Sequence, residues 1–294
     1  MDISVIIVTY NSTACIAACV ASVLEQSGVA FEVIVVDNAS ADATLEQLKN
    51  FNVRVIASPE NLGFGRGNNL GFSSSCGRYI YLLNPDARLT QKDALAEICR
   101  AMDANPNWGM AGTRVQAANG NAEDLPATSY PGQRHVRRDF SKLPGRIAWI
   151  LGASMIIRRE LYERLGGFDP RFFLYSEETD FCLRLRELGF EIGHIRGVAV
   201  SHIGGASEDL RDPYEVAARK LKGLMLFRQK HYAPDDCVFL ARRDLRRARF
   251  RAVWNGFLAR FQPARSAAWK KSRNYRAVWE VSRDYLAHAG TKQN

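Results

Sequence analysis

Asp86 is the side chain whose position most strongly indicates chemistry. It follows the apolar run Tyr79–Leu83 after an Asn84-Pro85 corner. Consecutive Tyr, Ile and Leu residues favour a strand that is covered on both faces, and Pro85 ends strand pairing because it has no N–H to donate. Asp86 is therefore expected just past the carboxyl end of a buried strand, where open α/β sheets bind ligands. The structural alternative is an Asp that caps a helix beginning near Thr90.

The three preceding apolar runs also end in polar residues, namely Thr9, Asp37 and Asn61. Helical patterns separate these runs, and alternation of strands and helices with short connections predicts a parallel, doubly wound sheet. Parallel strands end along one edge of a sheet, so these side chains and Asp86 should form one site. Taken singly, Asp37 is also compatible with a helix cap and Asn61 with a turn. The predicted strands cover residues 3–9, 31–36, 53–57 and 79–83, and the helices about 13–26, 43–50 and 62–75.

An acidic cluster supplies a second set of titratable groups. Glu177, Glu178 and Asp180 directly follow a bulky aromatic run and begin a predicted helix that ends at Gly189. One or two of these carboxylates would complement the helix dipole. The helix dipole does not account for a third carboxylate. Burial behind the aromatic side chains would raise the pKa of such a carboxyl group and suit it to general-base catalysis.

His202 follows another predicted strand, over residues 191–200. A single His is more often structural than a ligand. At a strand end, in a chain that already offers Asp86, it is a candidate metal ligand.

The glycine-rich stretch from Gly63 to Gly67 resembles a dinucleotide-binding fingerprint but differs from it in two ways. Its spacing is G-x-G-x-G, and it follows the third strand instead of the first. These glycines are therefore expected to let a helix pack close to the strands or to let a ligand approach the backbone. Beyond it, the sequence predicts a helix over 91–104, a strand over 108–115, a long turn-rich loop over 116–146 beside the site, and a return to the core over 147–157.

Composition narrows the class of protein. The 294 residues are 47% hydrophobic, which is enough for a substantial core, and no apolar run reaches the roughly 18 residues needed to span a bilayer. The first residues lack a positively charged segment and are expected to be a strand instead of a signal peptide. Six Cys without a C-x-x-C pair indicate reduced thiols, and these features favour a cytoplasmic protein.

Positive charge is concentrated in the last third of the chain. Residues 211–294 carry 20 Lys and Arg against 7 Asp and Glu, a net +13, whereas residues 1–210 are net −4. We expect a catalytic domain over 1–210 and a basic helical C-terminal extension over 211–294. Aromatic residues at helical spacing within 238–261 fit an anionic membrane surface. The alternative is an appendage packed on the catalytic domain; nucleic acid ranks last, because no binding motif accompanies the charge.

The chain resembles family 2 glycosyltransferases, in the bacterial branch that includes rhamnosyltransferases of cell-surface polysaccharide assembly. The resemblance covers about residues 3–232 and rests on the order of several motifs. These are V-I-I-V-T-Y-N, V-D-N-A-S, N-L-G-F-G-R-G-N-N-L-G, L-L-N-P-D, G-A-S-M-I-I-R-R, G-G-F-D, E-E-T-D-F-C-L-R, H-I-G-G-A-S and L-F-R-Q-K-H. It implies a GT-A fold, a doubly wound and mostly parallel sheet flanked by helices, and transfer of a sugar with inversion at the anomeric carbon.

The resemblance also implies roles for single residues. Asp86 and His202 would bind Mg²⁺ or Mn²⁺ at the donor diphosphate, and one Asp is enough because Mg²⁺ keeps several waters. Glu178 would be the base, with Glu177 and Asp180 as alternatives, because the family's Glu-Asp pair is Glu-Glu here. The nucleotide-sugar would contact Thr9, Asp37, Asn61, Arg66, Asn69 and Asn84, with donor specificity set around Trp149 and Gly152.

The expected reaction is transfer from dTDP-rhamnose or a UDP-sugar to a saccharide or lipid-linked acceptor in bacterial surface polysaccharide or glycolipid assembly. The location would be cytoplasmic, free or peripheral on the inner face of the cytoplasmic membrane, with no nucleic acid partner. Two other classes stay open. A sugar-nucleotide pyrophosphorylase would want a glycine-rich, basic loop after the first strand, where this chain has Thr9-Tyr10-Asn11-Ser12. A non-catalytic nucleotide-sugar-binding protein would not need the acidic cluster.

Overall fold

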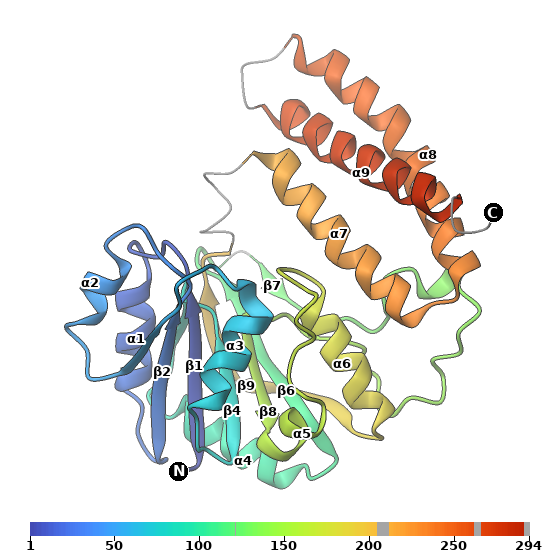
Figure 1. Ribbon diagram of the computed structural model, residues 1–294. Coiled ribbons are helices and arrows are strands. Elements are labelled where there is room, and N and C mark those ends of the chain that lie inside the picture. Colours follow the sequence, from blue (N-terminus) through green and yellow to red (C-terminus); the bar gives the residue numbers. More distant parts are fainter. Residues whose placement is uncertain (121, 205–211, 262–265, 291–294) are drawn as a thin grey trace. The chain divides into compact units, whose positions relative to one another are not determined.

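A mixed sheet forms the centre of the first part of the chain in the computed structural model, which describes residues 1–120, 122–204, 212–261 and 266–290 (Figure 1). Its strands among these residues are β1 (Ile3–Thr9), β2 (Phe31–Asp37), β3 (Arg54–Ala57), β4 (Tyr79–Leu83), β5 (Ala87–Leu89), β6 (Trp108–Ala117), β7 (Glu123–Asp124), β8 (Ser154–Arg158) and β9 (Glu191–His202). The strand order is β3-β2-β1-β4-β8-β6-β9-β5, and β7 pairs with β6.

The first four strands of that order are parallel, so their carboxyl ends lie along one edge. The register between β1 and β2 runs from Ile3 opposite Phe31 to Thr9 opposite Asp37. β4 joins β1 on the other side, and β8 is antiparallel to both β4 and β6. The predicted doubly wound, mostly parallel sheet is confirmed.

Helices cover both faces of this sheet (Figure 1). They are α1 (Ile16–Leu24), α2 (Thr44–Leu48), α3 (Gly63–Ser73), α4 (Ala94–Ala104), α5 (Arg159–Arg164) and α6 (Glu177–Glu187). Side chains alternate along β1, so Ile3, Val5 and Ile7 share a core with α1 and α4. Ile6 and Val8 point to the other face and share a core with α5 and α6, against which α3 also packs.

The glycines of α3 allow its close approach to β1. A Cβ on Gly67 would lie 2.7 Å from Val8 Cγ1, and one on Gly71 would lie 2.6 Å from Ile6 Cγ2. Both distances are shorter than a carbon–carbon contact can be, so any larger residue would push the helix off the sheet. The glycine-rich motif therefore serves helix packing, as one of the two sequence-based alternatives expected.

Three features of the sheet differ from the sequence-based expectation. Strand β5 was not predicted, because its three residues are extended only through pairing with β9, more than a hundred residues away. Within the expected loop 116–146, β7 pairs with β6 and residues Gln133–His135 form a 3₁₀ turn. The return to the core begins as irregular chain with one bridge between Ala127 and Trp149, and β8 starts only at Ser154.

The chain divides into two compact units. The first consists of the described parts of Met1–Tyr130, Ser141–Phe173 and Glu177–Ser207, and the second of Pro131–Phe140, Leu174–Ser176 and the described parts of Glu208–Asn294. The domain boundary expected at residue 210 lies outside the described residues. Two short segments that the sequence placed in the catalytic domain belong to the second unit, because they pack on its helices.

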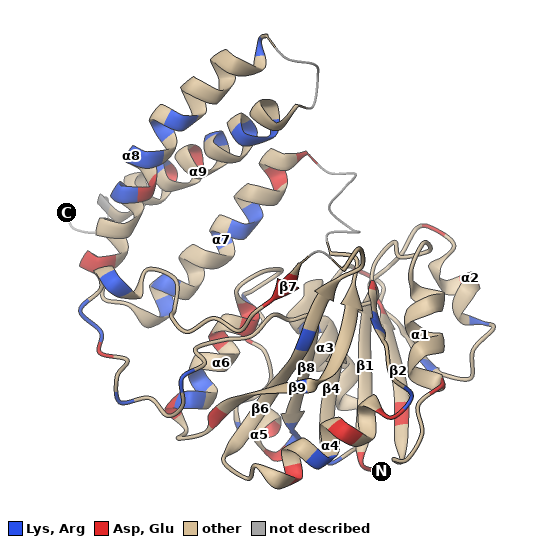
Figure 2. Ribbon diagram, turned by 180° about the vertical axis from the view of Figure 1, so that it is seen from behind, with Lys and Arg blue, Asp and Glu red and all other residues tan. Residues whose placement is uncertain are grey.

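The second unit consists mainly of α7 (Pro213–His231), α8 (Pro234–Ala259) and α9 (Ala267–Gly290). Its apolar core includes Leu221, Met225 and Ala241, and the buried Arg228 pairs through Nη1 with Oδ2 of the half-buried Asp244 at 2.7 Å. Figure 2 shows Lys and Arg along these helices. Among the described residues, none of the helices combines the length and the apolar character that crossing a bilayer requires.

Candidate active site

The carboxyl ends of β1 and β2 place Thr9 and Asp37 opposite each other. Both residues are buried, and the backbone N–H of Asn38 donates to the Thr9 carbonyl at 2.9 Å. Oδ2 of Asp37 accepts a hydrogen bond from the backbone N–H of Ser40 at 3.0 Å. Oγ1 of Thr9 and Oδ1 of Asp37 are buried and have no hydrogen-bond partner among the described residues. Two adjacent unpaired polar atoms are costly, and they mark this edge as a place where a polar ligand can bind.

The loops after β1 and β2 are tied to each other. Asn11, at φ +50°, accepts from the Ala41 N–H at 2.8 Å through Oδ1, and its own N–H donates to Ser40 Oγ at 2.9 Å. Asp42 accepts from the N–H groups of Thr13 and Thr44. Partial desolvation would raise the Asp42 pKa, but these hydrogen bonds outweigh it and lower the pKa to about 2. Sequence reasoning missed Asp42, although an Asp can accept a hydrogen bond from the backbone two residues on in an Asx turn, as it does here from Thr44.

The turn after β4 brings three predicted residues together. The Ala87 N–H donates to the Asn84 carbonyl at 3.1 Å, and β5 then pairs antiparallel with β9, with Ala87 opposite His202. This pairing leaves Asp86 Oδ1 3.2 Å from His202 Nε2 and Asn84 Nδ2 3.5 Å from the same nitrogen. The side chains of Asp86 and His202 are only 9% and 12% exposed. Asn84 and His202 are 118 positions apart in sequence, and the pairing of β5 with β9 brings them together.

Cys15, just before α1, and Cys19, within α1, lie behind this turn. Cys19 Sγ lies 3.4 Å from the Asn84 carbonyl oxygen. Burial, followed by the negative charge of Asp86, raises the pKa of Cys15 to about 11, so this thiol is neutral at physiological pH. The cysteines form an uncharged wall behind the acid and are not themselves reactive.

The acidic cluster begins α6, after two consecutive residues in the left-handed region, Tyr175 (φ +75°) and Ser176 (φ +70°). Glu177 is buried, with Oε2 unpaired among the described residues, and it faces Gly65 of α3. Burial, reinforced by the charge of Glu178, raises the Glu177 pKa well above its usual value. Glu178 is half-buried and is therefore the more accessible of the two carboxylates.

Asp180, an alternative base expected from the sequence, is one partner of an ion pair within α6. It is fully buried, and it forms an ion pair with Arg184 at 2.8 Å. Arg184 in turn donates to the carbonyls of Leu165 and Gly167, each at 2.9 Å. The pair therefore fastens the loop before Phe168 to α6, which leaves Asp180 poorly placed to accept a proton from a substrate.

Asn69 fastens the same loop from the other side. Its Oδ1 accepts from the Phe168 N–H at 2.9 Å and from the Tyr162 hydroxyl at 2.7 Å. Its Nδ2 donates to the Phe168 carbonyl at 2.8 Å. These three bonds use both lone pairs of Oδ1 and one N–H of Nδ2, so Asn69 holds the loop, and its contact with the nucleotide stays a sequence-based prediction.

The other expected donor contacts are spread along the beginning of α3 and the chain before β8. Asn61 Oδ1 accepts from the Gly63 N–H at 2.9 Å, and Arg66 pairs with Glu60 at 2.9 Å. Trp149 Nε1 donates to the Ser129 carbonyl at 3.2 Å. A Cβ on Gly152 would lie 3.5 Å from the Phe64 ring, and the carbonyl of the next residue accepts from the Asn84 N–H, so Gly152 borders the turn that holds Asp86.

A divalent cation fits the donor set at this turn. Mg²⁺ and Mn²⁺ take carboxylate, imidazole and water ligands, and a cation that bridges a diphosphate needs few ligands from the protein. Asp86 and His202 already lie within 3.2 Å of each other. Within the described residues no cluster of three or more His, Cys, Asp or Glu side chains offers a complete protein cage.

The sequence of this chain matches a known protein family. The sequence profile of glycosyl transferase family 2 matches residues 4–166, more than half of the chain, and ends before the acidic cluster and His202. The hexosyltransferase Agl10 of low-salt glycan biosynthesis in Haloferax volcanii is 28% identical over 215 residues, which cover 68% of this chain and 67% of that protein. The N-acetylglucosaminyl-diphospho-decaprenol L-rhamnosyltransferase of Mycobacterium tuberculosis is 25% identical over 232 residues, 66% of this chain and 73% of that protein.

The fold is similar to that of a mannosyltransferase from Pyrobaculum calidifontis, solved in complex with GDP-Man and Mn²⁺. The TM-score is 0.58 at 18% identity, and the match covers 98% of this chain and 75% of that one. This likeness shows the GT-A fold. Together with the family profile, it identifies the chain as a glycosyltransferase that belongs to glycosyl transferase family 2.

Proposed function

We propose that the chain transfers one sugar from a nucleotide-sugar to an acceptor hydroxyl, with inversion at the anomeric carbon and with help from Mg²⁺ or Mn²⁺. The convergence of Asp86, His202 and Asn84 at the end of β4 is the observation that carries this proposal. It provides a carboxylate and an imidazole at the edge of the sheet where open α/β sheets bind ligands.

The nucleotide would bind across the ends of β1 and β2. The unpaired Thr9 Oγ1 and Asp37 Oδ1 supply one group that can donate or accept and one that accepts, which suits the N–H and carbonyl groups of a nucleobase and the hydroxyls of a ribose. Asn61 and Arg66, at the beginning of α3, would contact the donor next to them. Trp149 and Gly152 would border the sugar.

Asp86 and His202 would hold the cation, with Asn84 beside them. When bound, the cation offsets the negative charge that develops on the departing diphosphate. The Asn84 amide and the buried position of Asp86 fix the direction in which ligands can approach, since the turn is held from behind by α1.

Glu178 would act as the base. Its carboxylate takes the proton of the acceptor hydroxyl as that oxygen bonds to the anomeric carbon, and the bond from carbon to diphosphate breaks with its electron pair on the leaving group. Glu177 is too buried to reach an acceptor, and burial raises its pKa, so it stays protonated to a higher pH than an ordinary Glu and cannot accept a proton in that form. Asp180 is occupied by Arg184.

The names of the relatives support a hexose or deoxyhexose as the transferred sugar. The sequence resemblance favours dTDP-rhamnose, with UDP-sugars next. A lipid-linked saccharide is the proposed acceptor, because the similar mycobacterial rhamnosyltransferase is named for one. The setting would be bacterial surface polysaccharide or glycolipid assembly at the cytoplasmic side of the membrane.

The test is a panel of nucleotide-sugars, incubated with the purified chain, Mn²⁺ or Mg²⁺, and a synthetic lipid-diphosphate GlcNAc acceptor, with products followed by mass spectrometry. The expected result is one donor whose sugar appears on the acceptor with inverted configuration by NMR. Formation of a nucleotide-sugar from sugar 1-phosphate and nucleoside triphosphate, or donor binding with no transfer of any sugar to this acceptor, would contradict the proposal.

A further inference from the structure

The second unit has an exposed aromatic stripe that runs along α8 and ends two residues after it, at Phe261. We define the stripe as Phe250, Val253, Trp254, Phe257 and Phe261. Their exposed fractions are 73%, 72%, 54%, 52% and 74%, respectively. Spacings of three and four residues place them on one face of the helix. Six of the thirteen exposed large apolar residues in the described part of the chain fall within residues 239–261, so this exposure is concentrated and not scattered.

The rings of the stripe are arranged against each other. Phe250 and Trp254 stack with centroids 6.4 Å apart and planes only 8° apart, and Phe257 meets Phe261 edge to face at 5.2 Å. The opposite face of α8 is already used, because Leu240, Ala241 and Ala248 are buried and α8 packs along α9. A contiguous apolar face that is left in water marks a surface for a partner or a membrane.

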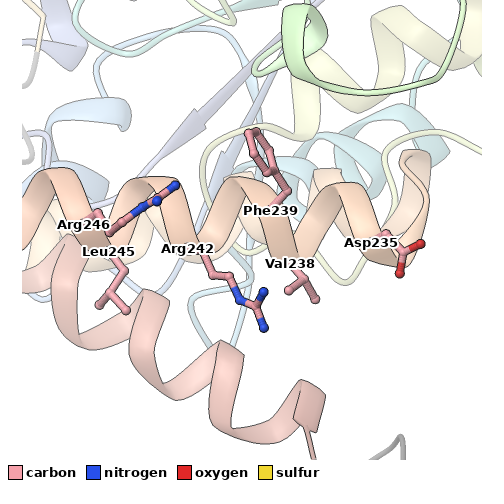
Figure 3. A pocket seen from close by; sticks show the side chains of 6 residues that line it. All are labelled: Asp235, Val238, Phe239, Arg242, Leu245 and Arg246. Atoms are coloured by element: carbon pink, nitrogen blue, oxygen red, sulfur yellow. The ribbon is translucent and has the colours of Figure 1, made fainter.

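The border of the stripe is uniformly basic. Every exposed charged residue between positions 242 and 260 is an arginine: Arg242, Arg246, Arg247, Arg249, Arg251 and Arg260. The one acid in this segment, Asp244, is half-buried and paired with Arg228. Towards the start of α8 there is an open groove of about 560 Å³. It is lined by Phe239 together with Asp235, Val238, Arg242, Leu245 and Arg246. In Figure 3, Arg242 and Leu245 leave the helix on the side opposite Phe239.

We propose that the aromatic stripe lies in the surface of an anionic phospholipid bilayer, parallel to the membrane, with the bordering arginines on lipid phosphates. Helices with bulky aromatics on one face and Arg beside them bind in this way. Arginine suits the contact because its planar guanidinium binds phosphate oxygens in pairs. Charge complementarity favours lipid over a second copy of the chain, since two stripes facing each other would bring arginines against arginines.

The test uses the full-length chain and sedimentation with vesicles of phosphatidylcholine alone or with about one quarter phosphatidylglycerol. We expect at least ~10-fold tighter binding to the anionic vesicles, weakening as salt is raised, because the Debye length shrinks. The assay reads lipid binding and no sugar transfer, so its failure and a failure of the proposed transferase reaction are distinguishable.

The decisive variant combines Phe250→Ser, Trp254→Ser and Phe257→Ser, and it should bind anionic vesicles at least ~10-fold more weakly. A matched control removes exposed apolar side chains from the first unit, by Leu45→Ser and Val55→Ser, and should bind like the wild type. Both proteins are checked for an unchanged melting temperature.

A charge variant keeps the test independent of the aromatic substitutions. Arg246, Arg247 and Arg249 are all changed to Gln, and the binding should fall and lose much of its salt dependence. The control makes the same change of net charge on the first unit at Lys49, Lys92 and Arg100, all of which are exposed.

Two results would overturn the proposal. One is equal vesicle binding by the wild type and the aromatic variant. The other is a wild-type dimer in analytical ultracentrifugation that the aromatic variant converts to a monomer while vesicle binding stays the same, because the stripe would then be an interface between two copies.

Discussion

Asp86 is held from three sides: by the turn at Asn84, by His202 from the far strand β9, and by the cysteines of α1 behind it. The position of this carboxylate is therefore fixed before any ligand binds. Its role therefore rests on charge, and the nearly isosteric Asp86→Asn change isolates that charge.

Asp86→Asn should weaken Mn²⁺-dependent binding of a nucleoside diphosphate at least ~10-fold, because the cation loses its only carboxylate ligand from this turn. Binding of the nucleoside alone should not change. Isothermal titration with and without Mn²⁺ measures both. Asp93→Asn is the matched control, since Asp93 is exposed and makes no capping hydrogen bond. Unaltered diphosphate binding by Asp86→Asn would remove Asp86 from the metal site.

Glu177 predicts a pH dependence of stability. Its folded-state pKa lies above its ordinary value of 4.5, so the folded protein holds a proton that the unfolded chain has already released. The stability that comes from this proton is complete below pH 4.5 and is lost as pH rises through the folded-state pKa. Glu177→Gln removes this loss, so the melting temperature of the variant relative to wild type should rise as pH increases from 4.5 towards the folded-state pKa of Glu177. A difference that stays constant over this range would contradict the burial of an uncompensated carboxyl.

At the scale of elements, the loop from Leu165 to Phe168 is the joint between α5 and the aromatic run before α6. Asn69 holds it from α3, and Arg184 holds it from α6 with Asp180 as its counter-ion. The positive φ angles of Gly166 and Gly167 let the loop turn sharply between these two contacts. This joint fixes where α6 begins and hence where Glu178 stands.

Asn69→Ala should lower the free energy of unfolding by about 1–3 kcal/mol, since it removes two partly buried hydrogen bonds to Phe168 and one to Tyr162 of α5. Donor affinity should stay within about twofold of wild type, because all three of these bonds are made within the protein. Urea unfolding and donor titration measure the two quantities, with exposed Asn52→Ala as the control. A large loss of donor affinity at unchanged stability would instead place Asn69 in the nucleotide site.

Helix α3 offers a second prediction at this scale. Gly71→Ala raises helix propensity, which alone would stabilise the helix by up to about 1 kcal/mol. The new methyl group would meet Ile6 at 2.6 Å, so we expect a net destabilisation of about 1–3 kcal/mol in urea unfolding. Ser73→Ala, at the end of the same helix, is the control. A more stable Gly71→Ala protein would show that α3 does not need its close contact with β1.

At the scale of the whole molecule, periodicity predicted the first four parallel strands and the helices between them with small errors at their ends. The long apolar runs at β1 and β2 are buried on both faces, so their pattern carries strong information. Strand β5 and the irregular chain before β8 could not be predicted, because their conformations depend on partners remote in sequence.

The candidate site was only partly predictable, because contacts between residues remote in sequence also decide its geometry. The sequence indicated that Asp86 and His202 lie at strand ends, but the antiparallel pairing of β5 with β9 that brings them together could not be predicted. Asn69 and Asp180 were assigned to the site by motif position. In the structure Asn69 bonds Phe168 and Tyr162, and Asp180 pairs with Arg184, which sequence alone does not show. The aromatic run within 238–261 indicated an amphipathic helix, but only packing against α9 reveals which of its aromatics are left exposed.

Turnover by Glu178→Gln is the most direct test of the proposed transfer reaction, measured with the donor identified from the panel and alongside the dissociation constant of that donor. The amide cannot accept the acceptor's proton, so kcat should fall at least ~100-fold while the donor dissociation constant stays within about twofold of wild type. Turnover at the wild-type rate would contradict the assignment of Glu178 as the base and, with it, the mechanism proposed for this site.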